Sequence, residues 1–249
     1  MVYAAVLAGG IGKRMQRSDL PKQFLPLGNK SVLVHTTEQF VLNPGVDKVI
    51  VAVPKDWLTF TKNLFTNENA LEYNSDKIEI IQGGDDRNAS LMAVVNQIES
   101  SNHINDDDII VSHDAVRPFL TQRIINENIE ECKTYGAVDT AYTLADTPVV
   151  SDDGKTIKEI PVRSTIFLGQ TPQTFNIKLL KEVYASLTDE ENKILTDTCK
   201  MFVIKNKTVR IVMGESYNIK ITTPFDYAMA LAFIERESHL NDQTNIPFD

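Results

Sequence analysis

The sequence predicts a three-layer α/β fold, in which an open, mostly parallel β-sheet lies between two layers of helices. Short apolar runs alternate along the first half of the chain with segments whose apolar residues recur at helical spacing. This alternation indicates parallel strands joined by crossover helices. The expected strands are 2–7, 48–53, 77–82 and 109–113, and the expected helices are 31–42, 56–65, 87–99 and 123–135.

The strand at 2–7 leads into a glycine turn at 8–12. Three glycines in four positions allow a sharp turn and bring backbone N–H groups close to an anion. The cations Lys13, Arg14 and Lys22 follow this turn. A strand, a glycine turn and nearby cations together predict a site for a polyphosphate.

Two better-known glycine loops do not fit this turn. The dinucleotide fingerprint needs a small residue where Met15 stands, and an acid at the end of the second strand, which instead ends at Val53. The ATP-type P-loop needs glycine at position 7 and serine or threonine after the lysine, where this chain has Leu7 and Arg14. The pattern L-A-G-G-x-G-x-R-M followed by P-K resembles nucleotidyltransferases that join a nucleoside triphosphate to a phosphorylated sugar or polyol.

Local signals set the ends of several elements. The first helix is expected to end near Asn43-Pro44-Gly45, and Gly136 suits the position after the helix at 123–135. Trp57 is expected in the core. Because ligands of open parallel sheets bind at the carboxyl ends of the strands, we expect the site where Asp114 follows the fourth strand.

The pattern changes after Gly136, where short β-like runs follow one another without a long helix between them. Asp152-Asp153-Gly154 fits a hairpin turn, and we interpret about 138–165 as a β-arm inserted into a single domain of residues 1–249. Unpaired arm edges favour a homodimer, and the alternative is a flap over the protein's own active site. The runs are 138–144, 148–151 and 156–161; helices at 176–186, 189–198 and 224–237 and a strand at 209–213 are expected beyond them.

Composition limits the function classes. The net charge of −9 argues against nucleic acid and an anionic membrane surface as partners, but not against a local cationic cleft. No apolar run approaches the ~20 residues of a membrane span, and no secretory leader is recognised, so we expect a cytoplasmic protein. Cys132 and Cys199 lack metal-ligand spacing and are expected to be reduced thiols.

Two further motifs follow predicted strands. The glycines of the motif at 83–90 allow a flat base to approach the backbone, and its Arg87 and Ser90 lie one helical turn apart. Asp114 ends the fourth strand, where a carboxylate suits Mg²⁺ bound to a triphosphate. We assign no role to His113, because a histidine within a strand usually packs in the core.

Five motifs occur, across nearly the whole chain, in the order seen in cytidylyltransferases of the methylerythritol-phosphate and ribitol-phosphate type. They are PKQF at 21–24, GGDDRNAS at 83–90, HDAVRP at 113–118, QTPQTF at 170–175 and NIKIT at 218–222. The resemblance implies a Rossmann-like sheet and a β-arm that builds a homodimer. It also implies Mg²⁺-dependent reaction of CTP with an alditol phosphate, giving a CDP-alditol and pyrophosphate.

The resemblance assigns roles to the matching residues. Those expected to bind CTP are Leu7, Ala8, Gly9, Gly10, Gly83, Gly84, Asp85, Asp86, Arg87, Asn88, Ala89, Ser90 and Ser112. The expected catalytic residues are Arg14, Lys22, Arg163 and Lys220, with Arg163 supplied by the partner's arm. Asp114 is the expected Mg²⁺ ligand, with Asn218 as a second metal contact, and the substrate-side candidates are Arg117, Thr147 and Thr171.

These residue types suit the reaction. The nucleophile is an oxygen of a phosphate monoester whose second pKa is about 6, so it is largely ionised at pH 7 without a general base. The enzyme's task is to align two anions and neutralise the charge that builds at the α-phosphate, which Arg, Lys and Mg²⁺ can do.

Alternatives remain within and outside the family. The isoprenoid enzymes typically carry a Pro-Ala-Ala-Gly loop and HDAARP, where this chain has Leu7-Ala8-Gly9-Gly10 and HDAVRP. These variants favour D-ribitol 5-phosphate, for teichoic acid or capsule synthesis, over 2-C-methyl-D-erythritol 4-phosphate. A non-catalytic nucleotide sensor would not need the whole catalytic and metal set, and the glycine loop disfavours an NAD-dependent reductase.

Overall fold

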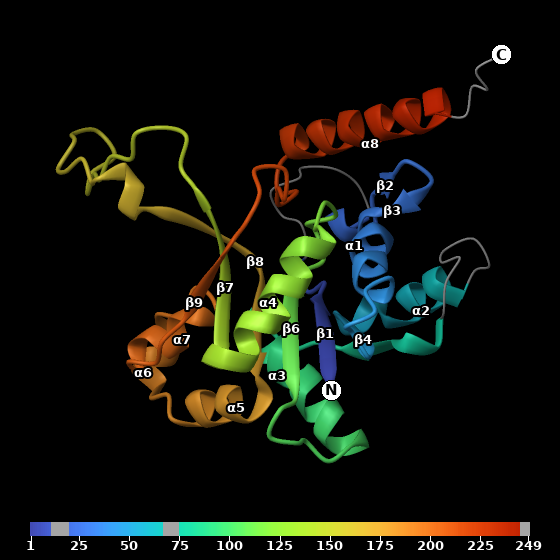
Figure 1. Ribbon diagram of the computed structural model, residues 1–249, viewed down its shortest axis with the longest axis horizontal. Helices are drawn as coiled ribbons and strands as arrows, with labels where there is room; N and C mark the ends of the chain where they lie inside the picture. The colour runs from blue at the N-terminus through green and yellow to red at the C-terminus, as the bar shows by residue number, and fades with distance from the viewer. Residues whose placement is uncertain (11–19, 67–74, 245–249) are drawn as a thin grey trace.

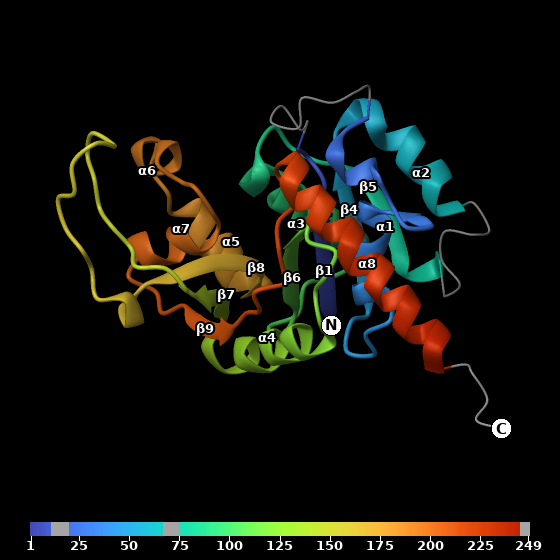
Figure 2. The ribbon, with the colours of Figure 1, turned by 90° about the horizontal axis from the view of Figure 1, so that it is seen from above.

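The computed structural model describes residues 1–10, 20–66 and 75–244, built around a seven-stranded sheet (Figures 1 and 2). The strand order is β5-β4-β1-β6-β8-β7-β9, and only β8 runs against its neighbours. The strands are β1 (Val2–Leu7), β4 (Lys48–Val53), β5 (Ile78–Gln82), β6 (Ile109–Asp114), β7 (Ala137–Thr143), β8 (Phe167–Asn176) and β9 (Arg210–Met213). The predicted open, mostly parallel sheet is confirmed.

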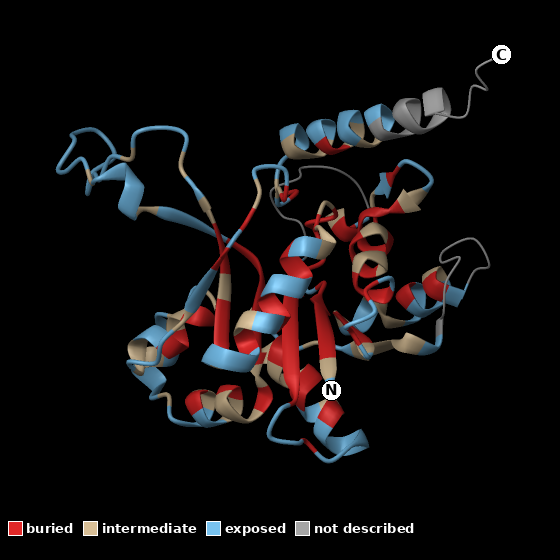
Figure 3. Ribbon diagram, in the orientation of Figure 1, coloured by how far each residue is buried: buried red, intermediate tan, exposed pale blue. Residues whose placement is uncertain are grey.

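Helices cover both faces of this sheet. Side chains of β1 alternate, so that Ala4 and Val6 pack on one face while Tyr3, Ala5 and Leu7 pack on the other. Figure 3 shows the resulting buried layer along the central strands and the inner sides of the helices. The first face holds α1 (Val32–Val41), α2 (Leu58–Thr66) and α4 (Gln122–Tyr135), and the second holds α3 (Arg87–Ser101), α5 (Ile177–Ala185) and α7 (Cys199–Ile204).

Polar caps fix where the helices begin and end. The side chain of Asp86 accepts a hydrogen bond from the Ala89 N–H at the start of α3. Thr121 caps α4 in the same way, and Gly136 ends that helix in the left-handed conformation, with φ +73°, as predicted. The cap at Asp86 sets the start of α3 at the carboxyl end of the sheet.

The second half of the sheet differs from its prediction. β7 is a full member of the sheet, between β8 and β9, so the segment that leaves the sheet begins after Thr143 and not at 138. β8 was not expected because its buried stretch is polar: Gln170, Thr171, Gln173 and Thr174 are all at least nine-tenths buried. Burial of hydrogen-bonded polar side chains hides such a strand from hydrophobic pattern analysis.

Residues 144–166 project from the body of the protein (Figures 1 and 2), and we call this segment the arm. Its hairpin is held by a single β-bridge, between Val150 and Glu159, so the expected short strands are mostly irregular. The side chains of Ile157, Ile160 and Val162 are each more than half exposed. The arm therefore presents apolar surface away from the core.

A last helix and several short elements complete the chain. Helix α8 begins at Pro224, as predicted, and packs over a small cluster that includes Leu27, Val116 and Ile221. Trp57, which was expected in the core, is half-buried and its ring packs against Phe24. The helix expected at 189–198 is shorter and spans Asp189–Lys193. No helix in the described ranges is long and apolar enough to span a membrane. The remaining elements are η2 (Lys22–Phe24), β2 (Pro26–Leu27), β3 (Lys30–Ser31), η3 (Lys55–Trp57), η4 (Ser75–Lys77), η5 (Arg163–Thr165), α6 (Asp189–Lys193) and α8 (Pro224–Thr244).

Candidate active site

A cavity of about 290 Å³ opens at the carboxyl ends of β1 and β6 and at the start of α3. It brings together residues that the sequence analysis selected from five separate segments. The predicted residues that line it are Leu7, Ala8, Gly9, Gly10, Lys22, Gly84, Asp85, Asp86, Arg87, Ser90, Asp114 and Lys220. Gln23, Ala115 and Val116 line it as well.

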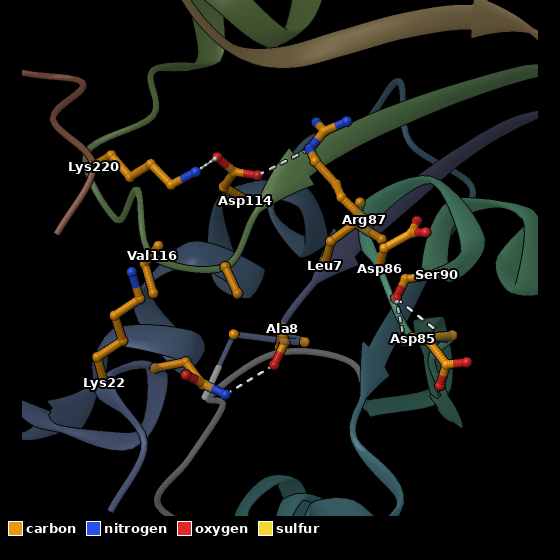
Figure 4. A pocket seen from close by; sticks show the side chains of 15 residues that line it. Leu7, Ala8, Lys22, Asp85, Asp86, Arg87, Ser90, Asp114, Val116 and Lys220 are labelled. Carbon is orange, nitrogen blue, oxygen red and sulfur yellow. Dashed lines mark hydrogen bonds and ion pairs between the residues drawn. The ribbon is translucent and has the colours of Figure 1, made fainter. Parts of the chain in front are cut away.

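Asp114 is the electrostatic centre of this cavity. Its Oδ2 atom lies 2.8 Å from Nζ of Lys220, and its Oδ1 atom lies 3.3 Å from Nε of Arg87. A third cation, Arg117, places Nε 3.7 Å from Oδ2. Burial opposes ionisation of Asp114, but the three cations outweigh it and hold the pKa of the carboxyl well below its usual value. Figure 4 shows Lys220 and Arg87 reaching Asp114 from different elements.

Buried hydrogen bonds fix Asp114 from behind. Its N–H donates to Oγ1 of Thr171 at 3.1 Å, and that hydroxyl lies 3.0 Å from Nδ1 of His113. Nε2 of His113 lies 3.1 Å from the carbonyl oxygen of Arg117. These contacts make Nε2 the protonated nitrogen, because a carbonyl can only accept. Burial lowers the pKa of His113 to about 4, so the ring is neutral at pH 7.

Arg117, Thr171 and Asn218 support the site without lining the cavity. Nη1 of Arg117 donates to the carbonyl oxygen of Asn218 at 2.7 Å. The Asn218 amide donates in turn to the carbonyl oxygen of Thr171 at 2.9 Å and is fully buried. This loop therefore holds Lys220, two residues further on, against Asp114.

The start of α3 forms a second wall of the cavity. A Cβ atom at Gly84 would lie 2.6 Å from Cβ of Ala89, so the turn has no room for a side chain there. Ser90 Oγ accepts from the Gly84 N–H at 3.1 Å and closes the turn. Glycine is therefore required at position 84 because the turn packs closely against the start of α3. Of the predicted CTP-binding residues, Gly83, Asn88, Ala89 and Ser112 do not line the cavity.

The loop at Leu7–Gly10 forms the opposite wall. Lys22 lies against it, since a Cβ atom at Gly10 would be 3.8 Å from Cε of Lys22. Gln23 was not predicted: its Nε2 donates to the carbonyl oxygen of Ala8 at 2.8 Å, and its side chain is buried. Its place next to Lys22 in the PKQF motif was the available signal. In Figure 4 this hydrogen bond is the dashed line that ends at Ala8.

Two further predicted site residues, both on the arm, do not line this cavity. Arg163 and Thr147 are exposed on the arm, and Nη1 of Arg163 donates to the carbonyl oxygen of Ala145 at 2.8 Å. Arg14 lies outside the described residues. Among the residues that the structure describes, no group of three or more His, Cys, Asp or Glu side chains could hold a metal ion by itself.

A strand-end cavity with a glycine loop on one wall and cations around an ionised carboxylate on the other is suited to an anionic nucleotide. The protein is of the nucleotidyltransferase class. The sequence model of the 2-C-methyl-D-erythritol 4-phosphate cytidylyltransferase (IspD) family matches residues 2–236. The chain belongs to this family of cytidylyltransferases.

Solved structures of this family share the fold over nearly the whole chain. The chain is 26% identical to 4-diphosphocytidyl-2C-methyl-D-erythritol synthase from Anaerococcus prevotii, with a TM-score of 0.76 over 94% of this chain and 96% of that one. It is 29% identical to 2-C-methyl-D-erythritol 4-phosphate cytidylyltransferase from Francisella tularensis, with a TM-score of 0.71 over 92% and 97%. The Thermus thermophilus enzyme of that name, at 24% identity and a TM-score of 0.70 over 94% and 100%, supports the fold alone.

Proposed function

We propose that the protein joins CTP to D-ribitol 5-phosphate, giving CDP-ribitol and pyrophosphate for a teichoic acid or capsule polymer. The observation that carries this proposal is the position of Asp114, paired with Lys220 and Arg87 in the cavity that the loop at 7–10 and Lys22 also line. The cavity thus combines a glycine loop with the cations Lys22, Arg87 and Lys220, which suits the proposed triphosphate and second phosphate.

The chemistry follows from these groups. A phosphate oxygen of the alditol phosphate attacks the α-phosphorus of CTP, the new P–O bond forms, and the bond to the β-phosphate breaks to release pyrophosphate. Lys22, together with Arg14, stabilises the charge that builds at the α-phosphate, while Lys220 positions the incoming phosphate. No general base is required, because the attacking phosphate is already ionised.

Asp114 is the residue that would hold Mg²⁺ in the proposed reaction, in exchange for part of its pairing with Lys220 and Arg87. A single ionised carboxylate suits Mg²⁺, which takes its other ligands from phosphate oxygens and water. When bound, the metal ion neutralises part of the triphosphate charge. Asn218 stays a weaker candidate for a second contact, because it is fully buried and does not line the cavity, although its amide oxygen has no hydrogen-bond partner among the described residues.

The choice of alditol depends on two sets of observations. The names of the similar structures favour a second candidate, 2-C-methyl-D-erythritol 4-phosphate. Three positions support ribitol 5-phosphate: Leu7, Gly9 and Val116 depart from the isoprenoid forms of the loop and of HDAARP, and all three line the cavity. Identities of 26% and 29% leave room for a different alditol within one fold.

A pyrophosphate-release assay with CTP and each alditol phosphate tests the proposal. We expect faster turnover with ribitol 5-phosphate, and mass spectrometry should identify CDP-ribitol. Faster turnover with methylerythritol phosphate would establish the second candidate. Tight CTP binding with no product from either substrate would instead indicate a nucleotide sensor.

The arm supports a proposed homodimer in which each arm completes the partner's site. It carries the exposed apolar side chains Ile157, Ile160 and Val162 beside Arg163. Burying such a patch against a second copy removes apolar surface from water. Arg163 and Thr147 would then contact the alditol phosphate of the neighbouring subunit. The cytoplasmic location stays a prediction.

A further inference from the structure

A row of polar side chains crosses three strands of the sheet next to Asp114. Ser112 on β6 is opposite Gln173 on β8, which is opposite Asp139 on β7. Directly opposed residues point to the same face, so these three side chains form one row. The next row toward the core is apolar, with Phe175 opposite Ile110. We call Ser112, Gln173 and Asp139, with Asp197 beside them, the polar row.

Hydrogen bonds orient the polar row. Nε2 of Gln173 donates to Oδ1 of Asp139 at 3.0 Å and to Oδ2 of Asp197 at 3.3 Å. Two carboxylates therefore hold the amide nitrogen, and the amide oxygen of Gln173 faces the other way. That oxygen is buried and has no hydrogen-bond partner among the described residues, and the same is true of Oγ of Ser112. Buried polar atoms of this kind are rarely left unpaired, and they usually bind an ordered water, an ion or a ligand.

Arg87 connects the polar row to the catalytic carboxylate. Its Nε atom approaches Asp114, and its Nη1 atom donates to Oγ1 of Thr198 at 2.6 Å, next to Asp197 in the sequence. Its Nη2 atom is buried without a hydrogen-bond partner in the described part of the chain. In Figure 4 the guanidinium of Arg87 extends beyond Asp114, away from the loop that carries Ala8. Arg87 thus joins the cavity, which the polar row itself does not line, to the segment that carries Asp197.

The chemistry of the polar row suits neutral hydroxyl groups rather than a phosphate. Asp139 and Asp197 are half-buried, which leaves them accessible to a ligand, and two carboxylates repel an anion. Burial, with the charge of Asp197, raises the pKa of Asp139 to about 6. Carboxyl and amide oxygens accept hydrogen bonds from hydroxyl donors. A methyl group placed here would leave these acceptors unpaired, which costs binding free energy.

We propose that Asp139, Gln173 and Asp197 bind the hydroxyl groups of the alditol chain and select an unbranched polyol phosphate over a methyl-branched one. This inference rests on the proposed function. Ribitol 5-phosphate presents an unbranched row of hydroxyl groups, whereas methylerythritol phosphate carries a methyl group on its chain. The selection occurs at a distance from the phosphates, so changes in the polar row should leave CTP binding intact.

The test compares the wild-type protein with Asp139→Leu and with the near-isosteric Asp139→Asn. For Asp139→Leu we expect the KM for ribitol 5-phosphate to rise at least about tenfold, with the KM for CTP unchanged within about twofold. The ratio of kcat/KM for methylerythritol phosphate over ribitol 5-phosphate should rise by a similar factor. Asp107→Asn, an exposed carboxylate at the opposite end of β6, is the matched control and should change neither KM.

Thermal unfolding separates binding from folding. If Asp139→Leu does not fold, Asp139→Asn tests the proposal in its place. In that variant the KM for ribitol 5-phosphate should rise while the KM for CTP stays unchanged. An unchanged KM for ribitol 5-phosphate in an active, folded variant would overturn the polar-row proposal and leave the proposed function standing. Equal changes in both KM values would overturn it too. A wild-type protein that forms no CDP-alditol would overturn the proposed function itself, and the polar row with it.

Discussion

Nζ of Lys220 lies 2.8 Å from Oδ2 of Asp114, although the two residues belong to segments at opposite ends of the chain. Lys220 is 40% exposed on its side chain, while Asp114 is nearly buried. Because the Lys220 side chain is partly exposed, its ammonium group can leave Asp114 and bind a ligand instead. The phosphate of an alditol phosphate would therefore compete with Asp114 for the Lys220 ammonium group.

Replacing Lys220 by methionine should remove the cation and keep most of the side chain's volume. We expect kcat to fall about 100-fold, the size seen when a preorganised donor to a developing charge is lost. The KM for CTP should change less than about threefold if Lys220 binds the incoming phosphate, as we propose. Steady-state kinetics with CTP and ribitol 5-phosphate measures both values.

Lys133→Met provides the control, since Lys133 is an exposed lysine at the far end of the sheet, paired only with Glu130 among the described residues. Its kcat should equal that of the wild type. A Lys220→Met enzyme with normal kcat and a raised KM for CTP would contradict the assignment of Lys220 to the second substrate.

Asp114→Asn should lower stability as well as activity. The change leaves Arg87, Arg117 and Lys220 close together without a counter-charge, and we expect a loss of about 2 kcal/mol in the free energy of unfolding at pH 7. Because the folded-state pKa of Asp114 is lowered, its stabilisation is complete above the unfolded pKa of about 3.9 and is lost as the pH falls below that value.

Urea unfolding at pH 7 and at pH 4 checks this expectation. The difference in the free energy of unfolding between wild type and Asp114→Asn should be largest at pH 7 and should begin to decrease near pH 4. A variant as stable as the wild type at pH 7 would mean that the three cations are adequately solvated without Asp114.

The sequence predicts the first half of this fold well because each strand there is a short apolar run that ends in a distinctive turn. The glycine loop at 7–10 and Asp114 fall where the strand ends predict them. In the second half, β8 carries buried glutamines and threonines whose partners are distant in the sequence. A polar strand of this kind is stabilised by tertiary hydrogen bonds, which local patterns do not encode.

The candidate site, like the fold, has one part that local sequence patterns predict and another that depends on tertiary contacts. Spacing and residue type identify the loops that line the cavity, but not which charged residues are buried behind it. Arg117 and Thr171 do not line the cavity; Arg117 pairs with the carboxylate of Asp114, and Thr171 accepts a hydrogen bond from its backbone N–H. Their expected contact with substrate stays a prediction. His113 was assigned no role, because a histidine within a strand usually packs in the core, and its ring is indeed buried, with contacts to Thr171 and Arg117. These roles depend on packing between β6, β8 and the loop at 218–222.

His113 predicts a pH dependence of stability. Its folded-state pKa is lowered to about 4 from an unfolded value of about 6.5, so below pH 6.5 only the unfolded state gains the proton. The wild type should therefore lose about 2 kcal/mol from this group between pH 7 and pH 5. His113→Gln, which cannot titrate, should lack that loss, as measured by urea unfolding at both pH values.

The pH dependence of stability must be compared between the wild type and His113→Gln, because Asp139 changes the free energy of unfolding in the opposite direction. Its raised pKa makes the folded state more stable as the pH falls toward 6 and below, in wild type and variant alike. The difference between the two proteins cancels this contribution and isolates His113. An equal loss of stability in both proteins would show that His113 is accessible to protons in the folded state.

The arm gives a prediction about subunit contacts. In the single chain, Val162 is 68% exposed and Arg163 bonds to the carbonyl oxygen of Ala145, away from the cavity. If the arm packs on a second copy, Val162→Asp should convert dimers to monomers, because burying a carboxylate in an apolar contact is costly. Sedimentation velocity at a fixed protein concentration measures this change. A wild-type protein that sediments as a monomer would rule out the arm as a dimer contact.

Hybrid dimers then decide which subunit supplies Arg163. Arg163→Ala and Lys220→Met should each be nearly inactive alone. When the two variants are co-expressed, each hybrid dimer has one site with both changes and one intact site if Arg163 acts on the partner's cavity. Activity should then recover to about a quarter of the wild-type value, since random pairing makes half of the dimers hybrid. If Arg163 serves its own subunit, every site keeps one lesion and no activity returns.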